Sequence, residues 1–287
     1  MRVEKFNVNE SGNLINILSK KFSNISLSKL KSILKNKDVK VDGVRVKENI
    51  FVDTGKEILI YFPDNFFELK VEIVYQDENI IVVNKPQNLE TINLDGVALI
   101  DFVKSQIGQE IFAVHRLDRN TTGLVVFAKN LEAKNELDKA FKNRTIDKFY
   151  LALVYGLLGK QNDKMIAYLK KDSQKSLVEV IDKPLSGYEK IQTNYTVVGD
   201  YENSSLVEVE LITGKTHQIR AHFAHIGNFV IGDEKYGDAK INKLFKRNKQ
   251  CLCSHKVIFH FEDGILRYLD GKTIELDKSK IEFCKNL

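Results

Sequence analysis

Four short stretches of this sequence place charged and aromatic residues where they could do chemistry. The densest is AVHRLDRNTTGLVVFAKN, residues 113–130, in which Arg116 and Arg119 bracket the carboxylate of Asp118. Because residues 124–128 are apolar and indicate a buried strand, the loop before them would present Asp118 from a rigid scaffold, as is common for catalytic groups. We therefore predict that Asp118 is a catalytic carboxylate. The alternative is an ordinary charged turn at the surface.

The other three stretches contribute further polar candidates. Residues 211–237, LITGKTHQIRAHFAHIGNFVIGDEKYG, end a strand and then begin a helix or tight loop at about residue 215. Residues 148–156, KFYLALVYG, indicate a strand, and residues 81–89, IVVNKPQNL, indicate a strand that runs into a Lys-Pro turn. The polar residues of these stretches include Tyr150, Lys215, His217 and Arg220.

Several patterns resemble binding motifs but lack a required residue. The Gly-Lys-Thr at residues 214–216 resembles the end of a phosphate-binding loop, but Val209 stands where that loop needs a glycine. Two groups of histidines and cysteines could suggest a metal site, but neither follows a firm spacing such as H-E-x-x-H or paired C-x-x-C. The residues concerned are His217, His222, His225, Cys251, Cys253, His255 and His260. No G-x-G-x-x-G follows a strand, so no dinucleotide site is indicated. From these three patterns together we expect no metal, no cofactor and no nucleotide hydrolysis.

The order of the elements favours an α+β fold for residues 71–287. Strands outnumber helices and do not alternate with them regularly, which argues for a mixed, mostly antiparallel sheet. The expected strands are residues 80–83, 123–128, 150–155, 195–198, 205–211 and 256–261. The expected helices are residues 99–105, residues 131–142 and one that starts near Thr216.

Residues 1–62 have the features of a separate small α/β unit, joined to the rest by a linker at residues 63–70. Apolar residues at helical spacing predict a helix over residues 13–22 and a second one that ends near residue 34, with Lys29, Lys31 and Lys35 pointing away from its apolar side. An Asp-Gly pair between two short alternating runs predicts a hairpin over residues 39–46, and a strand follows at residues 57–61.

The basic residues concentrate in this small unit. It contains 12 lysines and arginines against 7 acids, which accounts for the whole net charge of +5. A basic segment beside a neutral body suggests an appendage for a polyanion, with a phosphate backbone lying across the lysine-bearing helix and the hairpin. The alternative is an ordinary lysine-rich surface.

Composition limits the class of protein. A length of 287 residues fits one large or two ordinary domains, and the 3 cysteines, an odd number, suggest no disulfide framework. The first ten residues lack the apolar run of a secretory signal, and no window approaches the roughly 18 apolar residues of a membrane span. We expect a cytoplasmic protein that is a monomer and does not contact a membrane.

The four stretches, in this order, resemble the RluA-like pseudouridine synthases. The family pattern is approximately NKP-x-G-L, HRLDR-x-T-S-G-L, K-x-Y-L-A, TGRTHQIR and GD-x-x-YG, and the resemblance covers about residues 71–265. The N-terminal unit resembles an S4 domain, a small RNA-binding module that often precedes this catalytic domain. This second resemblance rests on the placement of the helices and on the VKVDGVRV hairpin.

The resemblance implies a reaction and a set of roles. The enzyme would isomerise specific uridines in structured RNA without a cofactor, breaking the bond from ribose C1′ to N1 and joining C1′ to C5. Asp118 would be the essential nucleophile or base, and Arg220 its cationic partner. Tyr150 would stack on the uracil or transfer a proton. Arg116, Lys215 and His217 would contact the RNA, as would Lys31 and Lys35 from the N-terminal unit.

Some residues depart from the family pattern, and other functions remain open. Lys215 replaces an arginine, Gln87 and Asn88 replace a small residue and a glycine, Thr122 replaces a serine, and Asn228-Phe229 replaces a His-Pro pair. None of these changes affects Asp118 itself, so they bear on the RNA target. We expect large-subunit ribosomal RNA first and transfer RNA second. The alternatives are a non-catalytic RNA-binding protein on the same fold and an N-glycoside hydrolase that uses a lone carboxylate.

Overall fold

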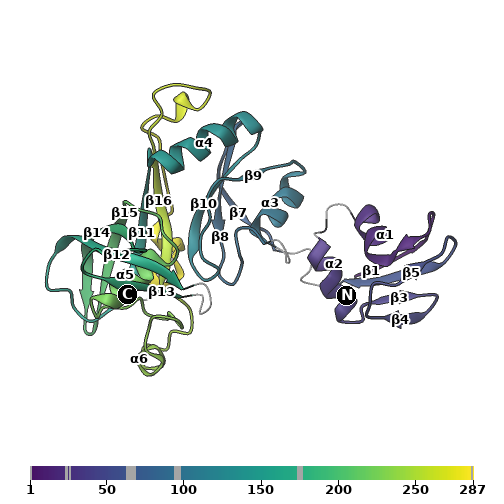
Figure 1. Cartoon of the computed structure of the whole chain (residues 1–287), viewed down its shortest axis with the longest axis horizontal. Coiled ribbons are helices and arrows are strands. Elements are labelled where there is room, and N and C mark those ends of the chain that lie inside the picture. The colour runs from purple at the N-terminus through teal and green to yellow at the C-terminus, as the bar shows by residue number, and fades with distance from the viewer. Residues whose placement is uncertain are drawn as a thin grey trace. The chain divides into compact units, whose positions relative to one another are not determined.

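The chain folds as two compact units (Figure 1). The computed structural model describes residues 2–22, 25, 27–62, 69–93, 98–172, 177–285 and 287. One unit consists of residues 1–71 together with 92–110, and the other of residues 72–91 together with 111–287. Most of the expected linker at residues 63–70 lies outside the described residues. No described helix is long and apolar enough to cross a membrane.

The N-terminal unit is built on a four-stranded antiparallel sheet in the order β1-β6-β3-β4. Its strands are β1 (Arg2–Asn7), β3 (Val39–Val41), β4 (Val44–Val46) and β6 (Glu57–Phe62), with a separate pair β2 (Gly12–Asn13) and β5 (Phe51–Val52). The helices are α1 (Leu14–Lys21) and α2 (Leu27–Lys35). The predicted helices and hairpin are thus confirmed.

Local chemistry accounts for these elements. Asp42 and Gly43 in the β3–β4 turn both have positive φ, 47° and 80°, as the tight primed turn of a hairpin requires. Leu18, Leu30 and Ile60 come from both helices and the sheet, and they are completely buried in one apolar cluster. This unit therefore has its own hydrophobic core.

Residues 92–110 belong to the N-terminal unit of the structure. The boundary expected from the sequence, at residue 70, would place them in the C-terminal unit. They contain α3 (Leu99–Ile107). The ammonium of Lys29 lies 4.2 Å from the centre of the Phe102 ring. Burial lowers the pKa of Lys29 to about 8, and Asp101 partly opposes this shift. Lys29 is thus partly buried in this packing, whereas Lys31 and Lys35 on the same helix are exposed.

The larger unit contains one long mixed sheet in the order β13-β12-β14-β15-β11-β16-β10-β8-β7. All the neighbouring strands in this order are antiparallel except β10 and β16. The strands are β7 (Glu72–Gln76), β8 (Ile80–Lys85), β10 (Thr122–Ala128), β11 (Ile146–Tyr155), β12 (Asn162–Asp172), β13 (Leu177–Ile181), β14 (Glu189–Tyr201), β15 (Ser204–Leu211) and β16 (Leu252–Phe259). The predicted α+β class with a mostly antiparallel sheet is confirmed.

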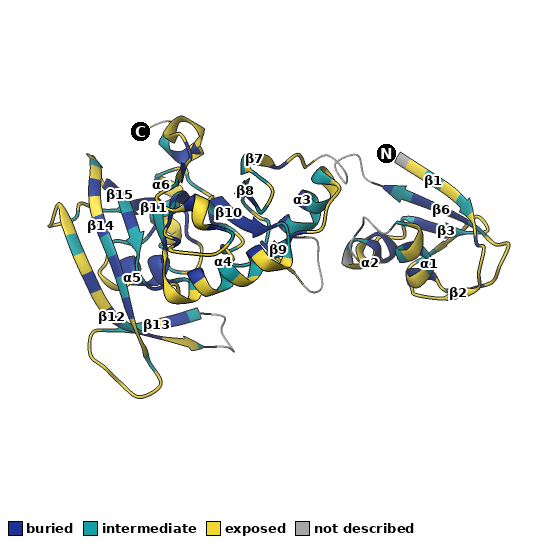
Figure 2. Ribbon diagram, turned by 90° about the horizontal axis from the view of Figure 1, so that it is seen from above, coloured by how far each residue is buried: buried dark blue, intermediate teal, exposed yellow. Residues whose placement is uncertain are grey.

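Three helices and several short elements complete this unit. The helices are α4 (Leu131–Asn143), α5 (Gln218–His225) and α6 (Ala239–Leu244). The short elements are β9 (Phe112–Ala113), β17 (Thr273–Glu275) and the 3₁₀ turns Arg267–Leu269, Lys278–Lys280 and Glu282–Cys284. The Asn130 side chain caps α4 by accepting the N–H of Ala133. Strands β10 and β8 are almost entirely buried, as their dark segments in Figure 2 show.

The parallel contact between β10 and β16 brings the loop before β10 to the middle of the sheet. Thr122 and Gly123 pair with Cys253 and Ser254. Gly123 has a φ of +105°, and a Cβ there would lie 2.1 Å from the Ser254 carbonyl oxygen. Only glycine allows this approach. The contact therefore fixes where the loop that carries Asp118 meets β11 and β16.

Candidate active site

The loop between β9 and β10 carries Asp118, and hydrogen bonds hold its backbone on both sides of this residue. The Leu117 N–H donates to Thr91 Oγ1 over 3.1 Å, and the Thr121 N–H donates to the Asp118 carbonyl over 3.1 Å. Lys85 Nζ donates to the Arg119 carbonyl over 3.0 Å. The backbone of this loop is thus fixed before any substrate arrives.

Lys85 is a fully buried lysine in the sequence Asn-Lys-Pro at the end of β8. Its ammonium also donates to the carbonyls of Pro86 and Leu89, over 2.9 and 2.6 Å. Burial lowers the pKa of Lys85 to about 8, against the opposing charges of Asp118 and Glu90. Lys85 was not among the predicted site residues, although the Asn-Lys-Pro motif contains it. The three carbonyl contacts make it a positioning residue for the loop.

Arg220 in α5 binds Asp118, as the family resemblance implied. Arg220 Nη1 donates to Asp118 Oδ2 over 2.9 Å, while Nε and Nη2 donate to the two oxygens of Asp233 over 2.6 and 2.9 Å. The Arg220 side chain is only 7% exposed. Burial opposes its charge, but hydrogen bonds and charge from Asp233 and Asp118 outweigh this and raise the pKa of Arg220. The guanidinium is therefore a permanent cation that joins two carboxylates.

Asp233 is the fixed end of this three-residue chain. Its side chain is completely buried, and its Oδ1 also accepts the N–H groups of Lys235 and Tyr236, over 2.8 and 3.1 Å. A buried carboxylate needs such partners because desolvation is otherwise costly. Asp233 was not among the predicted site residues. The GD-x-x-YG motif is the signal in the sequence that could have identified it.

The two oxygens of Asp118 have different environments. Oδ2 accepts the bond from Arg220, whereas no described residue donates to Oδ1. The carboxylate side chain remains 24% exposed. One oxygen is therefore anchored, and the other is available to a molecule in the cavity.

His217 lies against the carboxylate. Its Nε2 is 3.9 Å from Asp118 Oδ2, and its Nδ1 is 2.9 Å from the Tyr236 hydroxyl. The Tyr236 oxygen already accepts the Val178 N–H over 2.9 Å, which favours donation by its hydroxyl to Nδ1 and leaves the His217 proton on Nε2. Burial lowers the pKa of His217, with Asp118 opposing and Arg220 reinforcing the shift. The neutral imidazole thus presents an N–H towards Asp118.

Tyr150 lies on β11 and faces the same cavity as Asp118. The residue is 7% exposed. Burial raises the pKa of its hydroxyl well above the usual value, and the charge of Asp118 adds to this shift. The phenol therefore stays neutral and offers an aromatic ring with one hydroxyl.

Asp118, Arg220, His217 and Tyr150 line a cavity of about 400 Å³. The described charged residues around it are one carboxylate, Asp118, and five cations, Arg116, Arg144, Lys148, Lys215 and Arg220. Burial and the neighbouring Arg144 lower the pKa of Lys148. Lys215 is paired with Glu189. An excess of cations around one carboxylate suits a polyanionic substrate.

The structure brings together some of the predicted site residues but not all. Asp118, Arg220, Tyr150, Arg116, Lys215 and His217 all line this cavity. Lys31 and Lys35 are exposed on α2 in the other unit. The histidines at 222 and 225 have separate partners, Thr193 and Asp182. Among the described residues, no group of three or more His, Cys, Asp or Glu side chains could hold a metal ion.

Gln87, one of the departures from the family pattern, contacts the Asp118 loop. Its Nε2 donates to the carbonyls of Asn120 and Gln250, over 3.2 and 2.9 Å. Gln250 in turn donates to the Thr121 hydroxyl over 2.8 Å. Asn88 adopts a φ of 60°, a conformation that suits the glycine of the family pattern. The larger residue at position 87 therefore adds a support for the loop.

Comparison with known proteins decides the family. The model of a family described as "RNA pseudouridylate synthase" matches residues 79–225, a range that contains Asp118, Tyr150 and Arg220. The chain belongs to the RNA pseudouridylate synthase family. It is therefore a pseudouridine synthase.

Named relatives agree with this assignment. The synthase is 33% identical to ribosomal large subunit pseudouridine synthase D of Haemophilus ducreyi, over 77% of this chain and 71% of the relative. It is 31% identical to tRNA pseudouridine synthase C of Vibrio parahaemolyticus, over 72% and 88%. The structure of human RNA pseudouridylate synthase domain containing 1 aligns with a TM-score of 0.58 at 22% identity, over 76% and 96%. At this identity the likeness shows a shared fold and nothing more.

Proposed function

We propose that this synthase converts specific uridines of large-subunit ribosomal RNA to pseudouridine and that Asp118 carries the reaction. The observation that carries the proposal is the arrangement of the carboxylate: one oxygen is fixed by Arg220, and the other is available in a cation-lined cavity. Transfer RNA is the second candidate substrate, and the named relatives include enzymes for each.

The reaction is an isomerisation that needs no external reagent. The bond between ribose C1′ and uracil N1 breaks, C1′ joins C5, the C5 proton leaves and N1 gains a proton. Asp118 Oδ1 can serve in one of three ways: attack on C1′, attack on the uracil ring, or removal of a ribose proton. In each case the Arg220–Asp233 pair keeps the carboxylate in place through the rotation and reattachment of the base.

The other residues of the cavity act on the base and the strand. The uridine must leave its stack to reach Asp118, at a cost of a few kcal/mol. We assign the Tyr150 ring to stacking on the extruded uracil, and Arg116 and Lys148 to contacts with the flanking phosphates. His217 keeps an N–H towards Asp118, and we assign it to holding the carboxylate in position.

We also propose that residues 1–62 form an S4-like RNA-binding domain, followed by a linker at residues 63–70 and the catalytic domain at residues 71–287. The support is an independent apolar core with Lys31 and Lys35 exposed on α2. Exposed lysines gain affinity for RNA by releasing counterions. This domain would raise affinity without taking part in chemistry.

Pseudouridine mapping tests the main proposal. Total RNA from cells with and without the gene is treated with a carbodiimide and read by primer extension, which stops at pseudouridine. We expect one or a few stops to disappear on deletion and to return with the wild-type gene but not with Asp118→Asn. The positions of these stops identify the RNA.

A matched control uses another ion-paired aspartate. Asp163 pairs with Lys160 over 2.8 Å on β12, away from the cavity residues, and Asp163→Asn should restore every stop. An unchanged map on deletion of the gene would contradict the proposal and favour the non-catalytic alternative. Free uracil released from the RNA would instead favour a glycoside hydrolase.

A further inference from the structure

The segment after the Asp233 turn is strongly basic. Residues 239–249, AKINKLFKRNK, contain five cations and no acid; the cations are Lys240, Lys243, Lys246, Arg247 and Lys249. The first three are exposed. Lys249 pairs with Glu282 over 3.3 Å, whereas the other four form no ion pair with any residue that the structure describes. The segment thus has four cations without an ion-pair partner in the part of the chain that the structure describes.

This segment is attached rigidly to the catalytic ion-pair chain. Asn242 of α6 accepts the Gly232 N–H over 2.8 Å and donates to the Asp233 carbonyl over 3.1 Å. The Asp238 side chain caps α6 by accepting the N–H of Lys240 over 2.7 Å. Gly232 has a φ of +78°, and a Cβ there would lie 1.9 Å from the Lys249 carbonyl oxygen. The backbone that carries the lysines is therefore held in place relative to Asp233.

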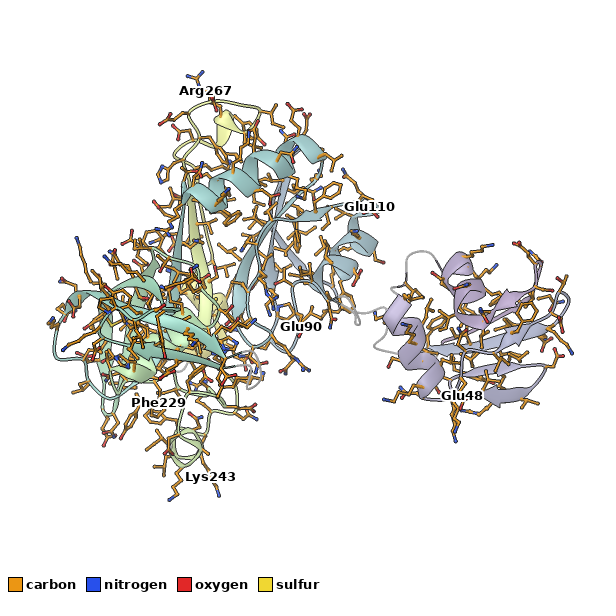
Figure 3. All side chains as sticks on the ribbon, in the orientation of Figure 1. Glu48, Glu90, Glu110, Phe229, Lys243 and Arg267 are labelled. Carbon is orange, nitrogen blue, oxygen red and sulfur yellow. The ribbon has the colours of Figure 1, made fainter. Side chains whose placement is uncertain are left out.

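The segment also projects from the domain. α6 extends away from the main sheet, at the opposite end of this unit from α4 (Figure 1), and Figure 3 labels Lys243 near the tip of the projection. A cavity of about 520 Å³ lies beside it. Its lining includes Asp233 and Asn242 as well as Lys243, Lys246 and Arg247. The projection is thus open to a large partner and close to the residues that hold Arg220.

We propose that residues 239–249 form an RNA-contact surface of the catalytic domain, at which Lys240, Lys243 and Lys246 bind phosphates of the substrate away from the target uridine. Lysine is well suited to this as a mobile point charge that can follow a backbone. Because the segment is attached to the Asp233 turn, this contact would determine where the RNA strand enters the active site. The inference rests on the proposed function only in taking RNA as the substrate.

The test compares two double variants of the full chain. Lys243→Gln/Lys246→Gln removes two charges three residues apart on the α6 segment. Lys139→Gln/Lys142→Gln removes two exposed lysines at the same spacing on α4, neither of which forms an ion pair with a described residue. The probe is deproteinised ribosomal RNA from cells lacking the gene, labelled with [5-³H]uridine. Binding is measured by filter retention at several salt concentrations, and turnover by the tritium that leaves C5.

We expect the α6 variant to bind RNA roughly tenfold or more weakly at 0.1 M salt, with a salt slope shallower by about 1.5. Its turnover at saturating RNA should equal that of the wild type, and the α4 variant should match the wild type in both. Unchanged binding and slope in the α6 variant, or an equal loss in the α4 variant, would overturn the inference. If no protein releases tritium, the proposed activity fails on this RNA, but the binding comparison still decides this surface.

Discussion

The active site and the two basic surfaces hold their charges in opposite ways. Arg220 is 7% exposed, and all three nitrogen atoms of its guanidinium group donate hydrogen bonds to carboxylates. Lys31 and Lys35 on α2, like Lys243 and Lys246 near α6, are exposed and have no carboxylate partner among the described residues. The same sign of charge is fixed in one region and mobile in the other.

This difference separates geometry from affinity. A buried guanidinium that donates several hydrogen bonds fixes the position of a carboxylate oxygen. Its loss should lower both turnover and the free energy of unfolding. Exposed lysines contribute through counterion release, so their loss should be felt as weaker, less salt-dependent binding. Substitutions that keep or remove charge in each region can test this division.

Arg220→Lys should have the largest effect in this comparison. Lysine keeps the charge but cannot bind Asp118 and both oxygens of Asp233 at once. We expect turnover at saturating RNA to fall by at least about 100-fold. The free energy of unfolding should fall by about 3 kcal/mol, because Asp233 stays buried with too few partners. Tritium release and urea unfolding measure the two effects.

The control is the same change at an exposed arginine. Arg45 in the N-terminal unit is 53% exposed and donates from Nη1 to the Lys37 carbonyl over 2.9 Å. Arg45→Lys should change the free energy of unfolding by less than about 0.5 kcal/mol and leave turnover unchanged. Equal losses in the two variants would remove the distinction between fixed and mobile cations.

A shift in pH should affect the fixed region first. His115 Nε2 accepts the Val126 N–H over 2.8 Å, and burial lowers the pKa of His115 to about 3. Below pH 6.5 the His115 imidazole is protonated in the unfolded chain but stays neutral in the folded chain. This histidine therefore lowers the free energy of unfolding as the pH falls towards 3. The wild type should lose about 1 kcal/mol more stability than His115→Gln between pH 6.5 and 5.5.

Urea unfolding of both proteins at these two pH values measures that difference. Burial also lowers the pKa of His222 to about 4, but this residue is present in both proteins and cancels. RNA binding through the lysines of α2 should not change over the same range, because lysines stay charged there. Identical pH dependence in the wild type and His115→Gln would show that this imidazole is not held neutral.

The smallest effect is expected for Lys31→Gln/Lys35→Gln. Both lysines are exposed, so stability should stay within about 0.5 kcal/mol of the wild type. The salt slope of RNA binding should become shallower by about 1.5, while turnover at saturating RNA is unchanged. Filter binding over a salt series checks this, with Lys139→Gln/Lys142→Gln as the control. An unchanged slope would contradict a role of α2 in RNA binding.

Much of the fold was predictable because its signals are local. The apolar run of β10 and the Asp-Gly turn between β3 and β4 both appear where the sequence places them. β12 (Asn162–Asp172) and β13 (Leu177–Ile181) were missed. In β12 only one side of the strand is covered, at Met165, Ala167 and Leu169, and charged residues interrupt the pattern. Such strands are defined by their partners in the sheet.

The sequence by itself determined which residues could react. The Arg-Leu-Asp-Arg loop singled out Asp118, and the family motifs added Arg220 and Tyr150. These assignments needed only residue types and their order along the chain. They did not need distances, because a motif records a chemical requirement even when its partners are unknown.

Only the tertiary structure decided how these residues are held. Asp118 and Arg220 are 102 positions apart in sequence, and their contact depends on β10 approaching β16 at Gly123. The burial of Asp233 and the carbonyl contacts of Lys85 likewise exist only once the sheet has formed. The physical reason is that hydrogen bonds and desolvation act over a few ångströms in space, and no spacing along the chain encodes such proximity between distant segments.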